Sequence, residues 1–525
     1  MTPAPPSRLI AILAFLGFFA VGGGWAIALP WDGGPDEQAH ITRAAGVVGG
    51  DVAAPPDYLT VPGFPRPLPG TRQTVPSGVL RKSPACFAFK PEQPASCLDE
   101  AARAPRPHAP ADGFSATGRY HPTYHAVVGW PLRIWPDDTG LLLARLLSAA
   151  LSAAFLAAAT YAVLAWARRP FLLAGLLVAA TPLALHLTGV INPNGLEITA
   201  AIAMWAALIP AVLGGGPIDR PAERPVDRRL LVLAGVAAAV VAWTRPSGPL
   251  AVALALAVLV GTAGRARLAR LARDRAARLV APAVAAACLT SGIWTLAMKA
   301  TELVPVPGGA GLGPAEALRV VAVERLSFYL KSMVGQFGWL DFNMPPAFYA
   351  VWFAAAGFLL LAALAAGTGR DRLRLLLAVA GAFALPLGMD VFGAESDGMV
   401  AQGRYMLPCA VGAALLAAYT VDERGLLARP FAPSVTRWLA AVVLPAHLAG
   451  LAYTMIRYQH GLRPGVPALN PLTGEWHPPL GSATALLTAT AGLIALGTMT
   501  WLCTRAARSG NAGAPRDRYT PAAAS

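Results

Sequence analysis

The chain has 525 residues, of which 55% are hydrophobic and only 13% are charged, and its mean hydropathy is +0.52. This composition is too apolar for a water-soluble protein of this length and excludes disorder over most of the chain, so it predicts a helical protein that crosses a membrane several times. The formal net charge of +14 needs no nucleic acid partner if the basic residues face anionic lipid headgroups.

Twelve apolar segments predict transmembrane helices, since a helix of about 20 residues crosses a hydrocarbon core of about 30 Å. They are 9–29, 140–167, 171–190, 195–213, 229–243, 247–263, 279–300, 347–367, 373–392, 405–421, 437–456 and 482–503. The fifth is short and is divided from the sixth only by WTRPSG, so these two could be one element. The first resembles a signal peptide, but its apolar run is longer than a signal sequence usually has, which favours a retained anchor.

The Lys and Arg residues predict the orientation of the chain. With a cytoplasmic N-terminus, the predicted inside segments hold more than half of the 42 basic residues, and the short outside loops hold few, as the positive-inside rule requires. We therefore expect both termini in the cytoplasm. The predicted units are the first transmembrane helix, an extracytoplasmic loop, helices 2–7, a second extracytoplasmic loop, helices 8–12 and a cytoplasmic tail. Their bounds are 1–29, 30–139, 140–300, 301–346, 347–503 and 504–525.

Two adjacent carboxylates, Asp36 and Glu37, follow the first apolar run in the sequence PDEQAH, and His40 and Arg43 come about one helical turn later. A carboxylate on the outer side of a membrane is suited to general base catalysis. The alternative is a plain acidic first turn of a surface helix, because Pro35 is favoured there and the helix dipole favours acids. We expect the two neighbouring side chains to diverge by about 100° and to have different tasks.

The rest of the first outer loop is rich in proline, particularly at 54–70, so we expect no large regular element there. Cys86 and Cys97 lie in this loop on the predicted oxidising side and are expected to form a disulfide bond. The other three cysteines lie in predicted spans. No Cys or His spacing completes a zinc site, so metal dependence is unknown from the sequence.

Four further polar motifs lie at the predicted outer ends of spans that are far apart in sequence. They are INPNGLE at 191–197, WTRPSG at 243–248, GQFGWLDFN at 335–343 and ESDGMVAQGRYMLP at 395–408. Together with PDEQAH, they are explained more simply by one shared site than by separate loop caps. The predicted substrate-binding residues are His40, Arg43, Arg145, Asn192, Asn194, Arg245, Trp339, Asp341, Gln402, Arg404 and Tyr405.

Each of these residue types has a specific reason to be in such a site. Arg145, Arg245 and Arg404 could bind a phosphate, although an arginine near the end of a span can also extend its head to the interface. Trp339 could stack on a sugar, or it could be an interfacial anchor. Asn192 and its neighbour are equally suited to helix capping.

Four of these motifs, PDEQAH, INPNGLE, GQFGWLD and QGRYMLP, together with ARLLSA at 144–149, resemble in their order a family of bacterial polytopic membrane proteins that share a domain of unknown function, DUF2142. This family in turn resembles the C-type (GT-C) superfamily of membrane glycosyltransferases, whose members have an acidic residue in the first outer loop and use polyprenyl phosphate sugars. The resemblance implies an all-α, GT-C-like polytopic protein of the bacterial plasma membrane. One departure is Arg245, where such relatives are expected to have Lys, and this keeps the charge but alters the phosphate geometry.

A transferase on the outer face needs a lipid-linked donor, because nucleotide sugars are absent outside the cell, and the sequence has no P-loop or glycine-rich dinucleotide motif. We therefore predict sugar transfer from a polyprenyl phosphate to an envelope glycan, lipid or protein. Asp36 is the predicted general base, which His40 is expected to orient or hydrogen-bond. Glu37 is the predicted supporting carboxylate, placed to meet a metal ion, a sugar hydroxyl or Arg43. No cofactor is required, and a divalent cation is an optional helper. A transporter or lipid flippase, which typically has internal repeats, and a non-catalytic envelope-assembly protein are the alternatives.

Overall fold

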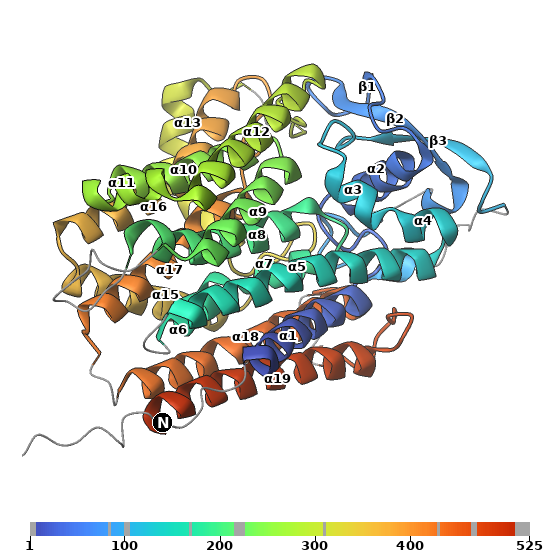
Figure 1. Ribbon diagram of the computed structural model, residues 1–525. Helices are drawn as coiled ribbons and strands as arrows, with labels where there is room; N and C mark the ends of the chain where they lie inside the picture. The colour runs from blue at the N-terminus through green and yellow to red at the C-terminus, as the bar shows by residue number, and fades with distance from the viewer. Residues whose placement is uncertain are drawn as a thin grey trace, which may run out of the picture.

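The computed structural model describes residues 7–81, 86–98, 106–166, 171–214, 226–307, 311–427, 431–463 and 470–509, and most of the predicted cytoplasmic tail lies outside these ranges. Helices, most of them long, form the bulk of the molecule (Figure 1). They are α1 (Ser7–Ala28), α5 (Asp138–Trp166), α6 (Phe171–Ala179), α7 (Pro182–Thr188), α8 (Pro193–Leu208), α9 (Arg228–Thr244), α10 (Gly248–Gly261), α11 (Arg265–Arg273), α12 (Arg275–Ala297), α15 (Pro346–Ala366), α16 (Gly369–Gly393), α17 (Gly403–Arg424), α18 (Ala432–His460) and α19 (Ser482–Ser509).

Every one of the twelve predicted spans coincides with helix in the described ranges. Nine of the described helices are long and apolar enough to cross a membrane alone, and two bent pairs raise this number to eleven. The remaining segment, α9, has 17 residues and is not among them. The polytopic helical fold is therefore confirmed, whereas the number of twelve crossings stays a prediction.

Two of the predicted spans depart from single straight helices. The third is broken into α6 and α7, whose axes differ by 63°, because Pro182 and the Thr181 side chain, which accepts the Ala184 N–H at 3.1 Å, start a new helix. The sixth, α10, is followed by α11 at 120°. The fifth and sixth are separate helices, as predicted, with the break at Arg245–Ser247.

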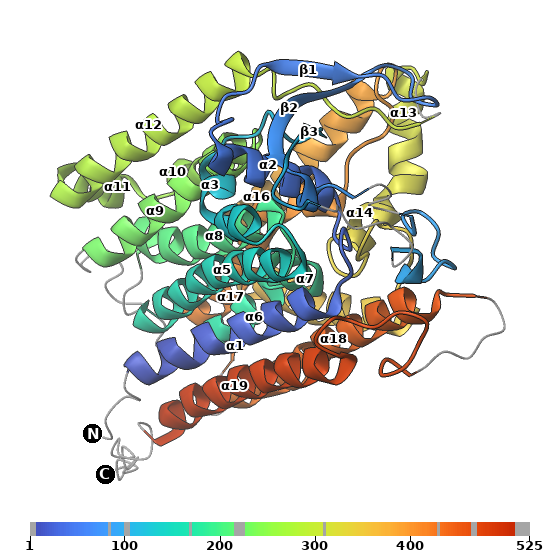
Figure 2. The same ribbon diagram turned by 90° about the vertical axis from the view of Figure 1, so that its right-hand side faces the viewer.

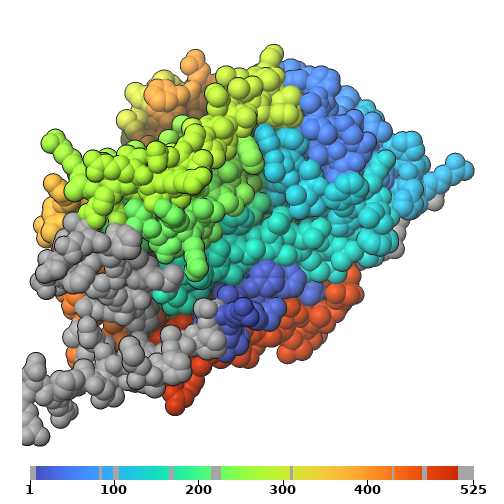
Figure 3. Space-filling view, viewed as in Figure 1, coloured from blue at the N-terminus to red at the C-terminus, as the bar shows by residue number. Residues whose placement is uncertain are grey.

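The centre of the bundle is α8, in which every residue is buried, as expected for a helix that is apolar on all sides. Its last turn continues as the π-helical turn η3 (Ile209–Leu213). At the edge, α1 lies between α5 and α19 and is visible as a blue band in Figure 3. A Cβ atom at Gly24 would lie 2.7 Å from that of Ala489, so glycine allows α1 and α19 to approach closely.

The first outer loop forms a small folded unit at one end of the bundle (Figures 1 and 2). It contains α2 (Glu37–Gly49), β1 (Pro56–Leu59), β2 (Leu68–Pro76), η1 (Ser77–Val79), η2 (Ala95–Leu98), β3 (Pro110–Ser115), α3 (Thr123–Val128) and α4 (Trp130–Ile134). The strands form an antiparallel sheet in the order β1-β2-β3, with Thr71 opposite both Pro56 and Ser115. The proline-rich stretch thus supplies β1 and the start of β2, which the sequence did not predict. Pro56 is tolerated because it is the first residue of an edge strand.

Two further segments connect this unit to the bundle. Cys86 and Cys97, the pair predicted from the sequence, are joined by a disulfide bond. The second outer loop, 301–346, is in good part helical, with α13 (Pro314–Val320), η4 (Val321–Arg325) and α14 (Leu326–Ser332). Its Val334 carbonyl accepts the Leu183 N–H at 3.1 Å, so it lies against the start of α7.

The start of α1 and the end of α19 lie at the end of the bundle opposite the sheet (Figures 1 and 2). The end that carries the sheet is called the sheet end below. The five polar motifs come together there through the contacts described next. Which side of the membrane the sheet end faces stays a prediction from the basic residues.

Candidate active site

The loop that carries PDEQAH is tightly wound between α1 and α2. Asp32 and Asp36 both have left-handed backbone angles, with φ of 57° and 59°, which residues other than glycine rarely adopt. Asp36 precedes the first residue of α2, but its side chain makes no capping hydrogen bond. The Asp32 carboxylate accepts the Gln38 N–H instead, at 2.9 Å. Since Asp32 does the capping, the Asp36 carboxylate is left for another contact.

That contact is an ion pair with Arg404 at the start of α17. Arg404 Nη2 lies 2.7 Å from Asp36 Oδ2, and the Asp36 side chain is 44% exposed whereas that of Arg404 is 3% exposed. Arg404 Nη2 also lies 3.3 Å from the Tyr405 hydroxyl. The Nε and Nη1 atoms of Arg404 are buried without a hydrogen-bond partner in the described part of the chain. A buried guanidinium with two unused donors beside an accessible carboxylate is an incomplete polar site.

A second guanidinium, that of Arg245, lies in the same cluster. Its Nη1 donates to Asn194 Oδ1 at 2.6 Å, and its Nη2 lies 3.4 Å from the Tyr120 hydroxyl. Its Cζ is 4.5 Å from the ring centroid of Tyr405, which is a cation–π distance. Arg245 Nε is also buried without a partner among the described residues. The tyrosine ring therefore lies beside both arginines.

Glu37, the neighbour of Asp36, points in another direction and is fully buried. Arg145 donates to it from Nε at 2.8 Å and from Nη2 at 2.5 Å, and Ile191 N–H donates to it at 2.9 Å. The remaining donors of Arg145 bond the carbonyls that end α1. These are the carbonyls of Ala26, Leu29 and Pro30. This pair joins α1, α5 and the start of α8, and its geometry is that of a structural ion pair.

Asn192 makes two contacts, one of which is the helix capping considered from the sequence, and its role in substrate binding stays a prediction. Its Oδ1 caps α8 by accepting the Asn194 N–H at 2.9 Å, and its Nδ2 donates to the Pro35 carbonyl at 2.8 Å. The first contact is the capping alternative. The second ties the INPNGLE motif to the PDEQAH loop directly before Asp36, so it fixes the position of the carboxylate.

His40 and Arg43 do not have the partners that the sequence suggested. His40 was expected to orient Asp36, but its Nδ1 lies 3.1 Å from Nε2 of His125 on α3. Burial, with Arg245 and Arg404 nearby, holds the pKa of His40 well below its usual range. Arg43 was suggested as a partner of Glu37, but it donates to three backbone carbonyls of the small unit. Both residues therefore support the fold around the site.

Trp339 and Asp341 are also engaged in supporting contacts. Trp339 Nε1 donates to the Asp32 carbonyl at 2.9 Å, which braces the loop before Asp36. Asp341 forms a buried ion pair at 2.6 Å with Arg457 of α18. Arg457 also donates to the Phe87 carbonyl beside the disulfide bond. The indole N–H of Trp339 thus positions the loop, and the stacking role suggested for its ring stays a prediction.

Gln402 and Gly403 bring Arg404 to its place. Gln402 precedes α17, and its Oε1 is buried without a partner among the described residues. A Cβ atom at Gly403 would lie 2.3 Å from the Met333 backbone nitrogen, so only glycine lets α17 begin this close to the end of α14. The Gly403 N–H donates to Ser332 Oγ at 2.8 Å.

Three residues of this region were not predicted from the sequence as site residues: Asp32, Tyr120 and Arg457. Asp32 lies four residues before Asp36. Burial of Asp32, with Glu37 and Asp36 near it, raises the pKa of Asp32 well above the usual range. The signal that could have identified it is the DGG sequence, which favours a tight turn capped by its Asp. In the sequence, Tyr120 has only the features of an aromatic anchor at the membrane interface. Arg457 has only those of an arginine at the end of a span.

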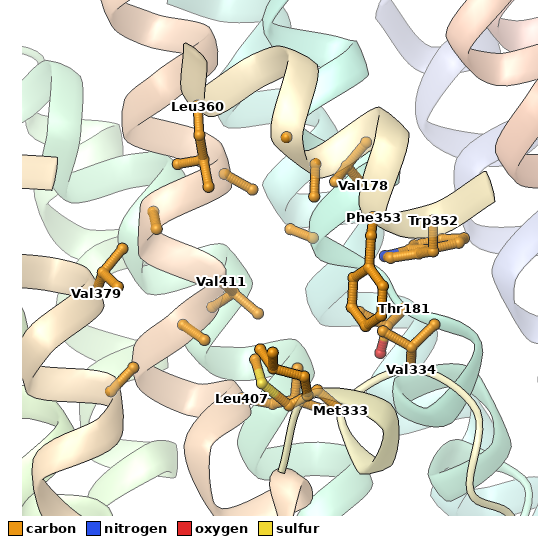
Figure 4. Close-up of a pocket in the computed structure, with 18 of the residues that line it drawn as sticks. Val178, Thr181, Met333, Val334, Trp352, Phe353, Leu360, Val379, Leu407 and Val411 are labelled. Carbon is orange, nitrogen blue, oxygen red and sulfur yellow. The ribbon is translucent and has the colours of Figure 1, made fainter. Parts of the chain in front are cut away.

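An apolar cavity of about 310 Å³ lies within the bundle, beside the part of α17 that follows Arg404. Leu407 and Val411 line one wall, Met333 and Val334 another, and Trp352 of α15 a third (Figure 4). Leu407 is three residues after Arg404, so it is about one turn along the same helix. The cavity therefore begins about one helical turn from the buried guanidinium.

No group of three or more His, Cys, Asp or Glu side chains suited to a metal ion occurs within the described ranges. A role for a divalent cation stays a prediction, and the chemistry below uses only the side chains of the chain.

The fold and this polar cluster define a polytopic helical membrane protein with a candidate site at the sheet end. The chain belongs to the family of predicted membrane proteins called DUF2142, whose model matches residues 19–413. No curated protein matches the chain.

The solved structures similar to this chain include two of ArnT from Cupriavidus metallidurans. For the apo state, the identity is 14%, the TM-score is 0.41, and the match covers 92% of this chain and 75% of that one. For the state bound to undecaprenyl phosphate, the identity is 15% and the TM-score is 0.38, and the match covers 96% of this chain and 78% of that one. At these TM-scores the likeness carries no argument about what this chain binds or does.

Proposed function

We propose that this protein is a membrane glycosyltransferase that moves a sugar from a polyprenyl phosphate donor to a cell-envelope acceptor on the extracytoplasmic face. The observation that carries the proposal is the pairing of an accessible carboxylate, Asp36, with a buried guanidinium, Arg404, that has two unused donors. Asp36 is the proposed general base, and Arg404 binds the phosphate. The outward position of the sheet end, predicted from the basic residues, is part of this proposal.

The phosphate is suited to this cluster by charge and by hydrogen bonding. Arg404 and Arg245 supply two positive charges, with the carboxylate of Asp36 at Arg404 and the buried carboxyl group of Glu197 near Arg245. Both arginines have buried donors that lack partners in the described part of the chain, and a phosphate oxygen satisfies such donors in charge-assisted bonds. The phosphate gains negative charge as the sugar leaves, so these donors stabilise the transition state more than the ground state.

The lipid part of the donor is suited to the apolar cavity along α17. Its walls are side chains of Val, Leu, Met, Phe and Trp, with Thr181 as a single hydroxyl residue. An isoprenoid chain has no polar groups and therefore loses no hydrogen bond there. The arrangement of a cationic cluster about one turn from an apolar cavity fits an anionic amphiphile.

The proposed reaction has one bond-forming and one bond-breaking event at the anomeric carbon of the sugar. The acceptor hydroxyl oxygen forms a bond to this carbon, its proton passes to Asp36, and the carbon–oxygen bond to the phosphate breaks. Polyprenyl phosphate leaves with the electron pair. Asp36 is half-exposed, so an acceptor can approach it from the aqueous side, and the carboxylate is close to the phosphate site because it contacts Arg404.

The proposal can be tested by identifying the lipids that remain bound to the purified protein. Mass spectrometry of the wild type should detect a polyprenyl phosphate or its sugar ester, and Arg404→Ala should lose it. Arg8→Ala, at the opposite end of α1, is a matched control that should retain it. No polyprenyl phosphate in the wild type, or equal amounts in Arg404→Ala, would contradict the donor assignment.

One observation favours a second function, the movement of a lipid across the membrane. The break between α6 and α7 is a feature of transporters, whose broken helices line their binding sites, and Thr181 at this break lines the apolar cavity. Transport of a fluorescent polyprenyl phosphate across vesicles without any sugar transfer would favour this second function.

A further inference from the structure

A second cleft, of about 770 Å³, lies at the sheet end beside Arg145, the partner of Glu37. It is formed by the last turn of α1, the first turns of α5 and the segment before α19. Its apolar wall contains side chains at the predicted membrane boundary, and its polar rim contains an ion pair. The apolar residues include Ile27, Leu29, Leu141, Leu142 and Leu480, and the rim includes Arg81, Asp138 and His477. A cleft with an apolar wall and a polar rim is suited to bind an amphiphile that lies at the membrane surface.

The charged side chains that line this cleft have both signs. Arg81 and Asp138 are paired at 2.8 Å. Arg145 also lines the cleft, but Glu37 behind it neutralises its charge. A zwitterion can therefore place its anionic group at the arginine and its cationic group at the aspartate.

Two indole rings support the recognition of a cationic group. Trp31 and Trp476 both line the cleft and are largely buried, and the Arg81 guanidinium already lies 4.1 Å from the ring centroid of Trp31. Ammonium groups make the same kind of contact with an indole face. Aromatic rings of this kind are also typical of the membrane–water interface.

We propose that this cleft binds a zwitterionic phospholipid with an amino headgroup, of the phosphatidylethanolamine type. The phosphate lies at Arg81, the ammonium group lies at Asp138 and the indoles, and the acyl chains follow Leu141, Leu142 and Ile27 into the bilayer. The site is independent of the proposed sugar transfer.

This ligand would also contact the back of the loop that carries Asp36. Trp31 Nε1 donates to Gln38 Oε1 at 3.0 Å, and Gln38 is in the first turn of α2. The lipid therefore stabilises the loop through Trp31, and its loss should lower the unfolding temperature of the whole protein.

Native mass spectrometry with added lipids tests the proposal. The wild type should retain phosphatidylethanolamine in preference to phosphatidylglycerol. Leu142→Trp fills the cleft without removing a polar contact and should abolish this retention, whereas Leu147→Trp, on the lipid-exposed part of α5, should keep it. The double variant Arg81→Gln/Asp138→Asn should weaken binding by about tenfold, the typical loss of a hydrogen bond to a charged group.

Equal retention in Leu142→Trp and the wild type, or a preference for phosphatidylglycerol or for a glycolipid without an amine, would overturn the proposal. Arg404→Ala distinguishes this site from the donor site, because it should lose polyprenyl phosphate and keep phosphatidylethanolamine.

Discussion

Asp36 and Glu37 are adjacent in sequence, and each is paired with an arginine, but the two pairs are opposites. Glu37 and Arg145 are both buried, and the guanidinium makes five hydrogen bonds that join α1, α5 and α2. Asp36 is half-exposed, and its partner Arg404 keeps two buried donors unused among the described residues. One pair is complete and holds helices together, while the other is open and has room for a ligand.

The backbone explains how two neighbours acquire such different roles. Consecutive helical side chains diverge by about 100°, and the left-handed angle at Asp36 turns it away from the helix that Glu37 begins. Asp32 then takes the capping bond. The difference indicates that a polar residue with all its bonds satisfied is a poor candidate for chemistry, even when it is next to a good one.

The largest expected effect on folding comes from Glu37→Gln. It leaves the Arg145 charge buried without its counter-charge, so the free energy of unfolding should fall by about 3–5 kcal/mol. Thermal unfolding in detergent, followed by size-exclusion chromatography, measures this. The double variant Glu37→Gln/Arg145→Met should be less destabilised than the single one. A wild-type unfolding temperature for Glu37→Gln would show that the two pairs do not differ as described.

Changes at Arg404 should affect the reaction more than the fold. Arg404→Lys keeps the charge but loses the planar fork, and Arg404→Ala loses both, so sugar transfer should fall in the order wild type, Lys, Ala. A loss of about 100-fold is expected for the alanine variant, as for other groups that stabilise transition-state charge. Release of polyprenyl phosphate from the lipid-linked sugar is the measurement. Full activity in both variants would make Arg404 a structural anchor.

Removal of the disulfide bond should have a moderate effect on stability. Cys86→Ser/Cys97→Ser frees the short loop that Arg457 contacts, and the chain-entropy model gives a loss of about 2–3 kcal/mol for a loop of this length. The loss should appear in thermal unfolding and leave the activity of the folded fraction nearly unchanged. Unreacted thiols at both positions in protein prepared under oxidising conditions would contradict the bond.

The smallest expected effect at neutral pH comes from His40 and His125, whose contribution to stability changes only as the pH falls. Burial holds the pKa of both histidines well below the usual range, so below about pH 6.5 the unfolded chain binds protons that the folded chain does not. Stability should therefore be complete above this pH and fall as the pH decreases, by up to about 1.4 kcal/mol per unit for each histidine. His40→Gln/His125→Gln should flatten the curve between pH 7 and 5. An unchanged slope would exclude these groups.

Much of this site could be predicted from the sequence because the motifs are polar residues in an apolar chain. PDEQAH, INPNGLE, WTRPSG and QGRYMLP were expected to share a site, and their residues do contact one another at the sheet end. Periodicity places helices and their ends reliably in such a chain. It also predicted that Asp36 and Glu37 would diverge.

The pairing of individual side chains could not be predicted. Glu37 reaches Arg145, and His40 reaches His125, through the relative rotation of helices, which no local pattern specifies. The strands of the small unit were hidden by their prolines, because Pro is usually absent from the middle of a sheet. The break at Thr181 had a local signal, a Thr-Pro pair, but the apolar run around it predicted one span.

The central claim is that Asp36 takes part in the reaction and not in capping or binding. Donor affinity and sugar transfer should therefore be measured on the same preparation of Asp36→Asn, in which a nearly isosteric side chain cannot accept the proton. We expect transfer to fall by about 100-fold to 10,000-fold. Binding of polyprenyl phosphate should be undiminished, because the anion that competes for Arg404 is gone. Transfer at the wild-type rate would contradict the claim.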